Sequence, residues 1–88
     1  MNKMAEQISQ LTVVNSLNEI KEDATVPRNV RAKIESVVNT LKEGTELLIK
    51  ANKALNELDE IANDVNLQPY TRTQIWNVMS MLEKIQIK

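Results

Sequence analysis

Three basic residues stand where a helix is predicted to begin, and there they could bind an anion. Arg28 and Arg31 closely follow Pro27, and Lys33 comes two positions after Arg31. The first turn of a helix has free backbone N–H groups and lies at the positive end of the helix dipole. Arg28, Arg31 and Lys33 are therefore the best candidates for contact with a phosphate or a carboxylate. Because no aromatic residue is interleaved with them, the signal for nucleic acid is weak, and an intramolecular role for Arg31 is the competing interpretation.

Two aspartates, Asp23 and Asp64, each follow a predicted helix and precede the next one. The negative end of a helix dipole disfavours a carboxylate by a few tenths to about 1 kcal/mol, so a compensating contact is expected. Each carboxylate can accept backbone N–H groups where the next helix starts, or pair with the arginine eight residues further on, Arg31 or Arg72. We predict these structural contacts. The alternative, a catalytic or metal-binding pair of aspartates, has no further support in the sequence.

Several carboxylates near the same helix ends could in principle line a Mg²⁺ or Ca²⁺ site. They are Glu19, Glu22, Asp23, Glu57, Asp59, Glu60 and Asp64. Their spacing is not that of an EF-hand, and we interpret them as solvated helix ends. The chain has no histidine, no cysteine and one glycine, which excludes zinc sites of the Cys or His type, thiolate and imidazole catalysis, disulfides and Gly-rich phosphate loops. We expect no metal, no cofactor, no small-molecule substrate and no enzymatic activity.

The aromatic residues are only Tyr70 and Trp76. Trp76 and Met81 fall on opposite sides of the apolar stripe of the last predicted helix. Because tryptophan and methionine are favoured at the centres of protein interfaces, Trp76, Met81 and Ile87 are candidates for contact with a partner. We expect Trp76 to be covered either by the start of the first helix or by a second copy of the chain, and full exposure would indicate an open binding site.

Apolar residues at helical spacing predict four helices and give little support for strands. The first covers residues 3–23, the second runs roughly from residue 27 to 42, and the last from about residue 69 to 85. The third has its apolar stripe over residues 47–62. Gly44 is expected to end the second helix in the left-handed conformation, and Thr45 to cap the third.

The two halves of the chain are similar to each other. A shift of 41 positions places residues 17–41 on residues 58–82, with identical residues at eight of the 25 aligned positions. The identities are Leu17/Leu58, Glu19/Glu60, Ile20/Ile61, Asp23/Asp64, Arg31/Arg72, Ile34/Ile75, Val37/Val78 and Leu41/Leu82. A period near 40 residues with two helices in each unit is typical of HEAT-like repeats.

The length of 88 residues fits one domain, so we predict a single helical domain over residues 1–88. Its expected fold is an all-α four-helix bundle built from two consecutive αα-hairpins. Because repeat stacks usually need about three units, two units favour a homodimer. The alternative is a closed monomer in which the first helix covers both hairpins.

The net charge of −1 and the pI near 5.4 give no general attraction to nucleic acid or to an anionic membrane. No signal peptide or membrane span is recognisable, and we expect a cytoplasmic protein without membrane contact. The favoured function is a non-enzymatic helical module that binds protein. The alternative is a small nucleic-acid- or ribosome-associated factor that contacts phosphate through Arg28, Arg31 and Lys33.

Two segments resemble a known family. They are NEIKEDATVPRNVR (residues 18–31) and LDEIANDVNLQPYTRTQIW (residues 58–76), with the signatures Asp-x₃-Pro-Arg-x₂-Arg and Pro-x-Thr-Arg-x₃-Trp. They are similar to the archaeal uncharacterised protein family (UPF) 0147, and the resemblance covers most of the chain but not residues 1–10. It implies a compact helical bundle and an archaeal cytoplasmic setting, and it implies no known activity.

Overall fold

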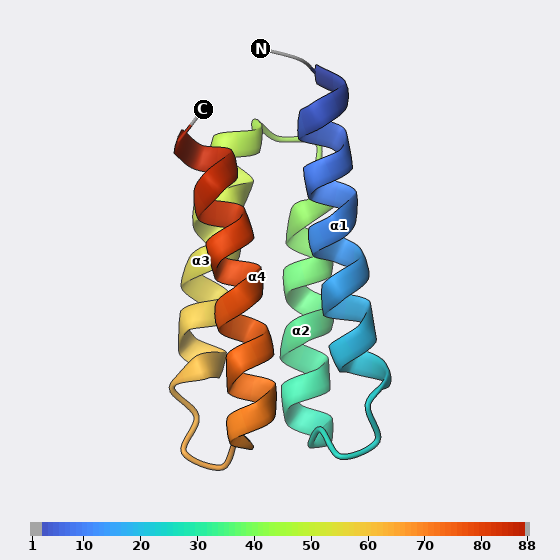
Figure 1. Ribbon diagram of the computed structural model, residues 1–88, viewed down its shortest axis with the longest axis vertical. Coiled ribbons are helices and arrows are strands. Elements are labelled where there is room, and N and C mark those ends of the chain that lie inside the picture. Colours follow the sequence, from blue (N-terminus) through green and yellow to red (C-terminus); the bar gives the residue numbers. More distant parts are fainter. Residues whose placement is uncertain (1–2, 88) are drawn as a thin grey trace.

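Four α-helices form a closed, up-and-down bundle (Figure 1). The computed structural model describes the backbone of residues 3–87 and the side chains of residues 10–85. The helices are α1 (Lys3–Glu22), α2 (Arg28–Leu41), α3 (Leu47–Ala62) and α4 (Pro69–Ile87). Each packs against two neighbours, α1 and α3 both contacting α2 and α4, so that α1 and α4 form one layer and α2 and α3 the other. The predicted all-α four-helix bundle is confirmed.

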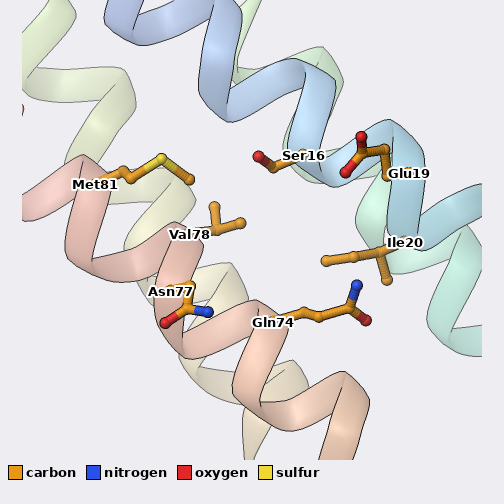
Figure 2. A pocket seen from close by; sticks show the side chains of 7 residues that line it. All are labelled: Ser16, Glu19, Ile20, Gln74, Asn77, Val78 and Met81. Atoms are coloured by element: carbon orange, nitrogen blue, oxygen red, sulfur yellow. The ribbon is translucent and has the colours of Figure 1, made fainter.

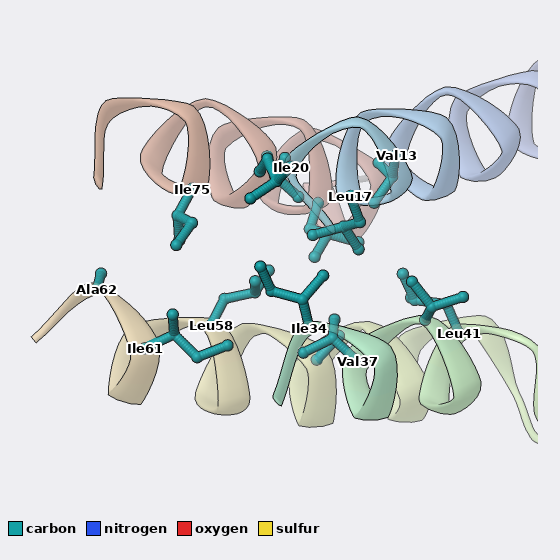
Figure 3. Close-up of a cluster of buried hydrophobic side chains, with 14 of the residues drawn as sticks. Val13, Leu17, Ile20, Ile34, Val37, Leu41, Leu58, Ile61, Ala62 and Ile75 are labelled. Carbon is teal, nitrogen blue, oxygen red and sulfur yellow. The ribbon is translucent and has the colours of Figure 1, made fainter. Parts of the chain in front are cut away.

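One apolar core runs along the axis of the bundle, and every helix contributes a stripe to it (Figure 3). The stripes follow the spacing of three and four residues that places side chains on one side of a helix. Core residues from α1 and α2 are Val13, Leu17, Ile20, Val30, Ile34, Val37, Val38 and Leu41, and those from α3 and α4 are Ala51, Ala54, Leu58, Ile61, Ala62, Ile75, Val78, Leu82 and Ile85. Val26 and Leu67, one from each hairpin turn, close the core at the end where the two turns lie.

The repeat is visible in the hydrogen bonds of the two hairpin turns. The N–H of Val26 donates to the carbonyl of Asp23 at 3.1 Å, and at the equivalent positions Leu67 donates to Asp64 at 3.1 Å. The equivalent of Pro27 is Gln68, and both residues directly precede a helix, while Pro69 is the first residue of α4. The shifted prolines do not change the turn, because a helix start tolerates a residue without an N–H at either position.

The HEAT-like arrangement itself is not confirmed. In a stack of repeats, equivalent helices of successive units lie side by side. Here α1 packs against α4, and α2 against α3, so the equivalent helices α1 and α3 lie diagonally across the bundle (Figure 1). The core is therefore closed within one chain, and its closure does not require a second copy.

The connection between α2 and α3 differs from the expectation. The helix α2 ends at Leu41, and Gly44 does not adopt a positive φ. The residue before α3 is Glu46, not Thr45, and its side chain makes no capping hydrogen bond. Residues 42–46 form a loop long enough to reverse the chain without a left-handed residue, so the special conformation of glycine is not needed.

The repeat makes a prediction about stability. Leu17 and Leu58 are equivalent and fully buried, so Leu17→Ala and Leu58→Ala should each lower the free energy of unfolding by about 2 to 5 kcal/mol, because each leaves a cavity in the shared core. Urea denaturation measures the loss, and Leu11→Ala, at a side chain that is 60% exposed, is the control and should change stability by less than about 0.5 kcal/mol. Losses below about 1 kcal/mol in both core variants would contradict the shared core.

Candidate functional site

The two aspartates stabilise the hairpin turns. Oδ1 of Asp23 accepts the backbone N–H of Thr25 at 2.9 Å and its hydroxyl at 2.7 Å. Oδ1 of Asp64 accepts the backbone N–H of Asn66 at 2.9 Å. Both carboxylates thus bond within the turn, two residues ahead, and not to the first N–H groups of the next helix as expected. Donation by the N–H of Thr25, followed by that of its hydroxyl, lowers the pKa of Asp23.

Neither of the two predicted Asp–Arg ion pairs is formed, and Arg72 binds backbone carbonyls instead. Nε of Arg72 donates to the carbonyl of Ala62 at 2.8 Å, and Nη2 donates to the carbonyl of Asp64 at 2.8 Å. The last carbonyls of a helix have no partner within that helix, so Arg72 caps the end of α3. The equivalent Arg31 differs, because its Nε is buried without a hydrogen-bond partner.

The three basic residues at the start of α2 do not form one anion site. Arg28 and Lys33 are exposed, whereas Arg31 is half-buried. Successive residues of an α-helix are about 100° apart around its axis, so Lys33 lies about 200° from Arg31, on nearly the opposite side. One anion therefore does not contact Arg31 and Lys33 together, and an anion contact by any of the three residues stays a prediction.

Trp76 is on the surface, with 54% of its area exposed. Met81 lies on the side of α4 that faces α1, where it lines a cavity between the two helices. Trp76 lies on the side that faces α3, since Arg72, one helical turn earlier, reaches the end of that helix. Cover of Trp76 by α1, one of the two expected alternatives, is therefore wrong. Trp76 and Met81 lie on different sides of α4, as expected, and the side chain of Ile87 lies outside the described residues.

The surface around Trp76 differs from the equivalent surface of the first hairpin. Glu35, the equivalent of Trp76, forms an ion pair with Lys21 of α1. The hydrogen bond from Lys21, together with its positive charge, lowers the pKa of Glu35. In the second hairpin the two positions hold Trp76 and Ala62, so the charged pair is replaced by apolar groups.

Apolar side chains extend this surface along the α3–α4 seam, the line on the surface where these two helices meet. Met79 lies three residues after Trp76 on the same side of α4 and is partly buried against the core. Leu55 and Leu48 share one side of α3, opposite the side where Glu57 contacts α2. Leu48, Leu55, Trp76 and Met79 are called the Trp76 face below.

An open cavity of about 180 Å³ lies at the surface between α1 and α4 (Figure 2). Its residues are Ser16, Glu19, Ile20, Gln74, Asn77, Val78 and Met81. Ile20 and Val78 are buried at its floor, whereas Glu19 and Asn77 are exposed. The side chain of Gln74 reaches from α4 towards α1, and its Oε1 is buried without a hydrogen-bond partner.

The equivalent seam between α2 and α3 is filled by a carboxylate. Glu57 of α3 accepts hydrogen bonds from the hydroxyls of Ser36 and Thr40 of α2, both at 2.9 Å. A shift of 41 positions places Ser16 on Glu57 and Met81 on Thr40. The α1–α4 seam therefore has a short side chain where the α2–α3 seam has a long one, and the cavity is at that place.

Neither Ser16 nor Gln74 was expected from the sequence to form a site, and Glu57 was expected only as a solvated carboxylate near a helix end. The signal was present but weak, because Ser16 and Glu57 lie one position before the aligned repeat. The contrast between Ser16 and Glu57 becomes visible when the residues that differ between the two halves are compared, and not only those that agree.

Neither metal binding nor membrane insertion gains support from the part of the chain that the structure describes. Within it, acidic side chains do not gather in a group of three that could hold a metal ion. None of its helices is long and apolar enough to cross a bilayer.

The fold and the turns define a class of short all-α proteins in which two equivalent hairpins close into one bundle. The chain belongs to the family described as "Uncharacterised protein family (UPF0147)", whose sequence profile matches residues 1–85. The resemblance noted in the sequence is confirmed, and the match also includes the first ten residues.

Relatives from archaea and one crystal structure agree with this assignment. The chain is 48% identical over 71 residues to a UPF0147 protein of Methanocaldococcus jannaschii, covering 80% of this chain and 76% of the relative. It is 39% identical over 87 residues to a UPF0147 protein of Methanosarcina acetivorans, covering 98% and 88%. The crystal structure of a protein of unknown function, MMP1188, matches with a TM-score of 0.87 at 38% identity, covering 94% of this chain and 96% of that chain.

The two equivalent arginines should respond differently to substitution. Arg72→Lys should lower the free energy of unfolding by about 1 to 3 kcal/mol, because a lysine cannot donate to two carbonyls from one planar group. Arg31→Lys should change it by less than about 0.5 kcal/mol, since the buried Nε of Arg31 makes no hydrogen bond. Chemical denaturation of the two variants measures both values, and equal losses would contradict the capping role of Arg72.

The lowered pKa of Asp23 predicts a dependence of stability on pH. Because the folded state favours the ionised carboxylate, its contribution is complete above the ordinary pKa of an aspartate, about 3.9, and is lost as the pH falls through the lower folded pKa. Asp23→Asn should therefore lose less stability than the wild type between about pH 5 and pH 2. Urea midpoints of both proteins across this pH range measure the loss of stability. Glu22→Gln is the matched control for the removal of one negative charge. Parallel pH curves for Asp23→Asn and the wild type would contradict the prediction.

Proposed function

We infer that this chain is a non-enzymatic interaction module that binds protein through the Trp76 face. The observation that carries the proposal is the exposure of the Trp76 indole at a position where the equivalent hairpin holds a paired glutamate. Large exposed aromatic side chains on a face with further apolar groups are typical of binding surfaces.

Burial of the exposed part of this indole would contribute substantially to binding. A fully buried aromatic side chain removes about 150 to 250 Å² from water, and 54% of the area of Trp76 is still exposed. At about 25 cal/mol per Å², burial of that part gives roughly 2 to 3 kcal/mol. The partly buried Leu55 and Met79, and Leu48 two helical turns further along α3, would add apolar area on the same face. Such a contact can form the centre of a small interface.

The occupant that we propose is a second copy of the chain. The Trp76 face lies along two antiparallel helices, α3 and α4 (Figure 1). A two-fold axis through such a face would place the same surface on both sides of the contact, which is the usual form of a homodimer interface. The alternative, a factor that binds phosphate, has less support, because Arg28 and Arg31 lie apart from Lys33 and the net charge is −1.

The Trp76 proposal can be tested directly, because the chain has one tryptophan. In a dilution series of the wild type, acrylamide quenching of Trp76 should rise as the protein is diluted, and sedimentation equilibrium should show a dimer that dissociates. Trp76→Glu should abolish the dimer, since it introduces a charge into the apolar contact. Tyr70→Glu, at a side chain that is 68% exposed on another side of α4, is the matched control and should dimerise as the wild type does.

A wild-type protein that stays monomeric at all concentrations, with its tryptophan always open to quenching, would overturn the homodimer. Loss of the dimer in both variants would show that the contact is not centred on Trp76. Binding that weakens steeply with added salt would instead favour the phosphate-binding alternative.

A further inference from the structure

We propose that an open groove between α1 and the end of α2 binds a peptide segment of a partner protein that carries both apolar and acidic side chains. The groove has a volume of about 370 Å³, and the residues that line it are Gln10, Leu11, Val14, Leu41, Lys42 and Lys50. It is called the Lys42 groove below. Because the α1–α2 seam is opposite the α3–α4 seam in the bundle, this surface is separate from the Trp76 face, and the inference does not depend on the homodimer.

The first observation is an apolar surface that a partner can reach. Leu11 is 60% exposed, and Val14 is only partly buried against the core. Leu41 is 3% exposed and lies at the base of the groove. Figure 1 shows α1 continuing past the point where α2 ends, so no further turn of α2 covers this part of α1. Leu11 and Val14 therefore offer apolar area that the fold of the chain leaves in contact with water.

The second observation is the charge at the rim. Lys42 is exposed and Lys50 is half-buried, and among the described side chains no aspartate or glutamate lines the groove. Nζ of Lys50 donates to the backbone carbonyl of Glu43 at 3.2 Å, whereas the carboxylate of Glu43 pairs with Lys53 at 3.5 Å. The groove is therefore positively charged, although the net charge of the chain is −1.

The two observations together determine the chemistry of the occupant. A small inorganic anion would leave Leu11 in water, and a purely apolar group would bring no charge to the two lysines. A segment with a leucine-like side chain beside an aspartate or glutamate matches both, because its carboxylate can reach an Nζ while its apolar side chain packs on Leu11. The groove is open to solvent, so a segment that covers it from outside removes more apolar area from water than a small molecule lying in it.

The third observation is the contrast with the equivalent seam. A shift of 41 positions places Leu11 on Asn52 and Lys42 on Glu83. The α3–α4 seam thus has a polar residue and a negative charge where the α1–α2 seam has an apolar residue and a positive one. Because both seams belong to the same closed bundle, the fold does not require Leu11 and Lys42 at these positions, and a binding role accounts for them.

The probe is the blocked peptide acetyl-Glu-Leu-Leu-Glu-amide, titrated into the full-length chain at constant ionic strength and followed by backbone amide shifts in NMR spectra. We expect saturable shifts centred on Leu11, Val14 and Lys42, with a Kd of about 1 mM or lower. The neutral acetyl-Gln-Leu-Leu-Gln-amide and the acidic but polar acetyl-Glu-Ser-Ser-Glu-amide should each bind at least about threefold more weakly. Sodium octanoate, a small anion with an apolar chain, should also bind more weakly than the acidic peptide.

Two variants test the assigned side chains. Lys42→Gln and Leu11→Ala should each weaken binding of the acidic peptide by about 3- to 10-fold, through loss of the charge and of the apolar area respectively. Both side chains are exposed, so both variants should fold. Lys84→Gln, which removes the same charge from an exposed position of α4, is the matched control and should bind within about twofold of the wild type.

A reversal of charge separates binding from folding. Lys42→Glu/Lys50→Glu should bind acetyl-Lys-Leu-Leu-Lys-amide more tightly than the acidic peptide, and loss of folding does not produce such a reversed preference. The proposal is overturned if the wild type shows no saturable shifts up to about 10 mM peptide, or if the neutral peptide or octanoate binds as tightly as the acidic peptide. It is also overturned if Lys42→Gln and Leu11→Ala both bind as the wild type does.

Discussion

Mutual burial of four apolar stripes is the constraint on which the rest of this structure depends. Each helix is amphipathic, and the stripes of Leu17, Ile34, Leu58 and Ile75 meet in one core. A helix that buries one stripe between two neighbours has its other side free for polar and functional residues. The four apolar stripes therefore determine the core, and the turns, the helix–helix contacts at the surface and the exposed faces are built around it.

The two hairpins share the residues that form the core and the turns, and they differ in residues on the outer faces. Both turns use an aspartate whose carboxylate accepts an N–H two residues later. The outer faces differ, since a Lys21–Glu35 ion pair on one hairpin corresponds to Ala62 and Trp76 on the other. The seams differ too, because Glu57 fills one and Ser16 leaves the other open. In a chain with internal repeats, positions that have diverged are thus the place to look for function.

The helices, the core and the repeat could be predicted from the sequence, because hydrophobic periodicity and the 41-residue shift report local packing requirements. The closed pairing could not, because stacked and facing hairpins bury similar stripes, and the choice depends on contacts between distant helices. The candidate sites were even harder to predict from the sequence. Arg72 binds carbonyls of the turn instead of Asp64's carboxylate, and an isolated sequence does not distinguish these acceptors. The cavity depends on the absence of a long side chain at Ser16, and residue type alone does not reveal such a space.

Both ends of the described chain and the α2–α3 loop lie at one end of the bundle, and the two Asp-containing turns lie at the other (Figure 1). With equivalent helices placed diagonally, this is the arrangement that two copies of a single αα-hairpin would adopt if they associated face to face and were then joined by residues 42–46. The chain can thus be described as a covalently linked pair of hairpins. Such a linkage allows each half to change independently, whereas a symmetric pair of identical hairpins would have to carry every substitution twice.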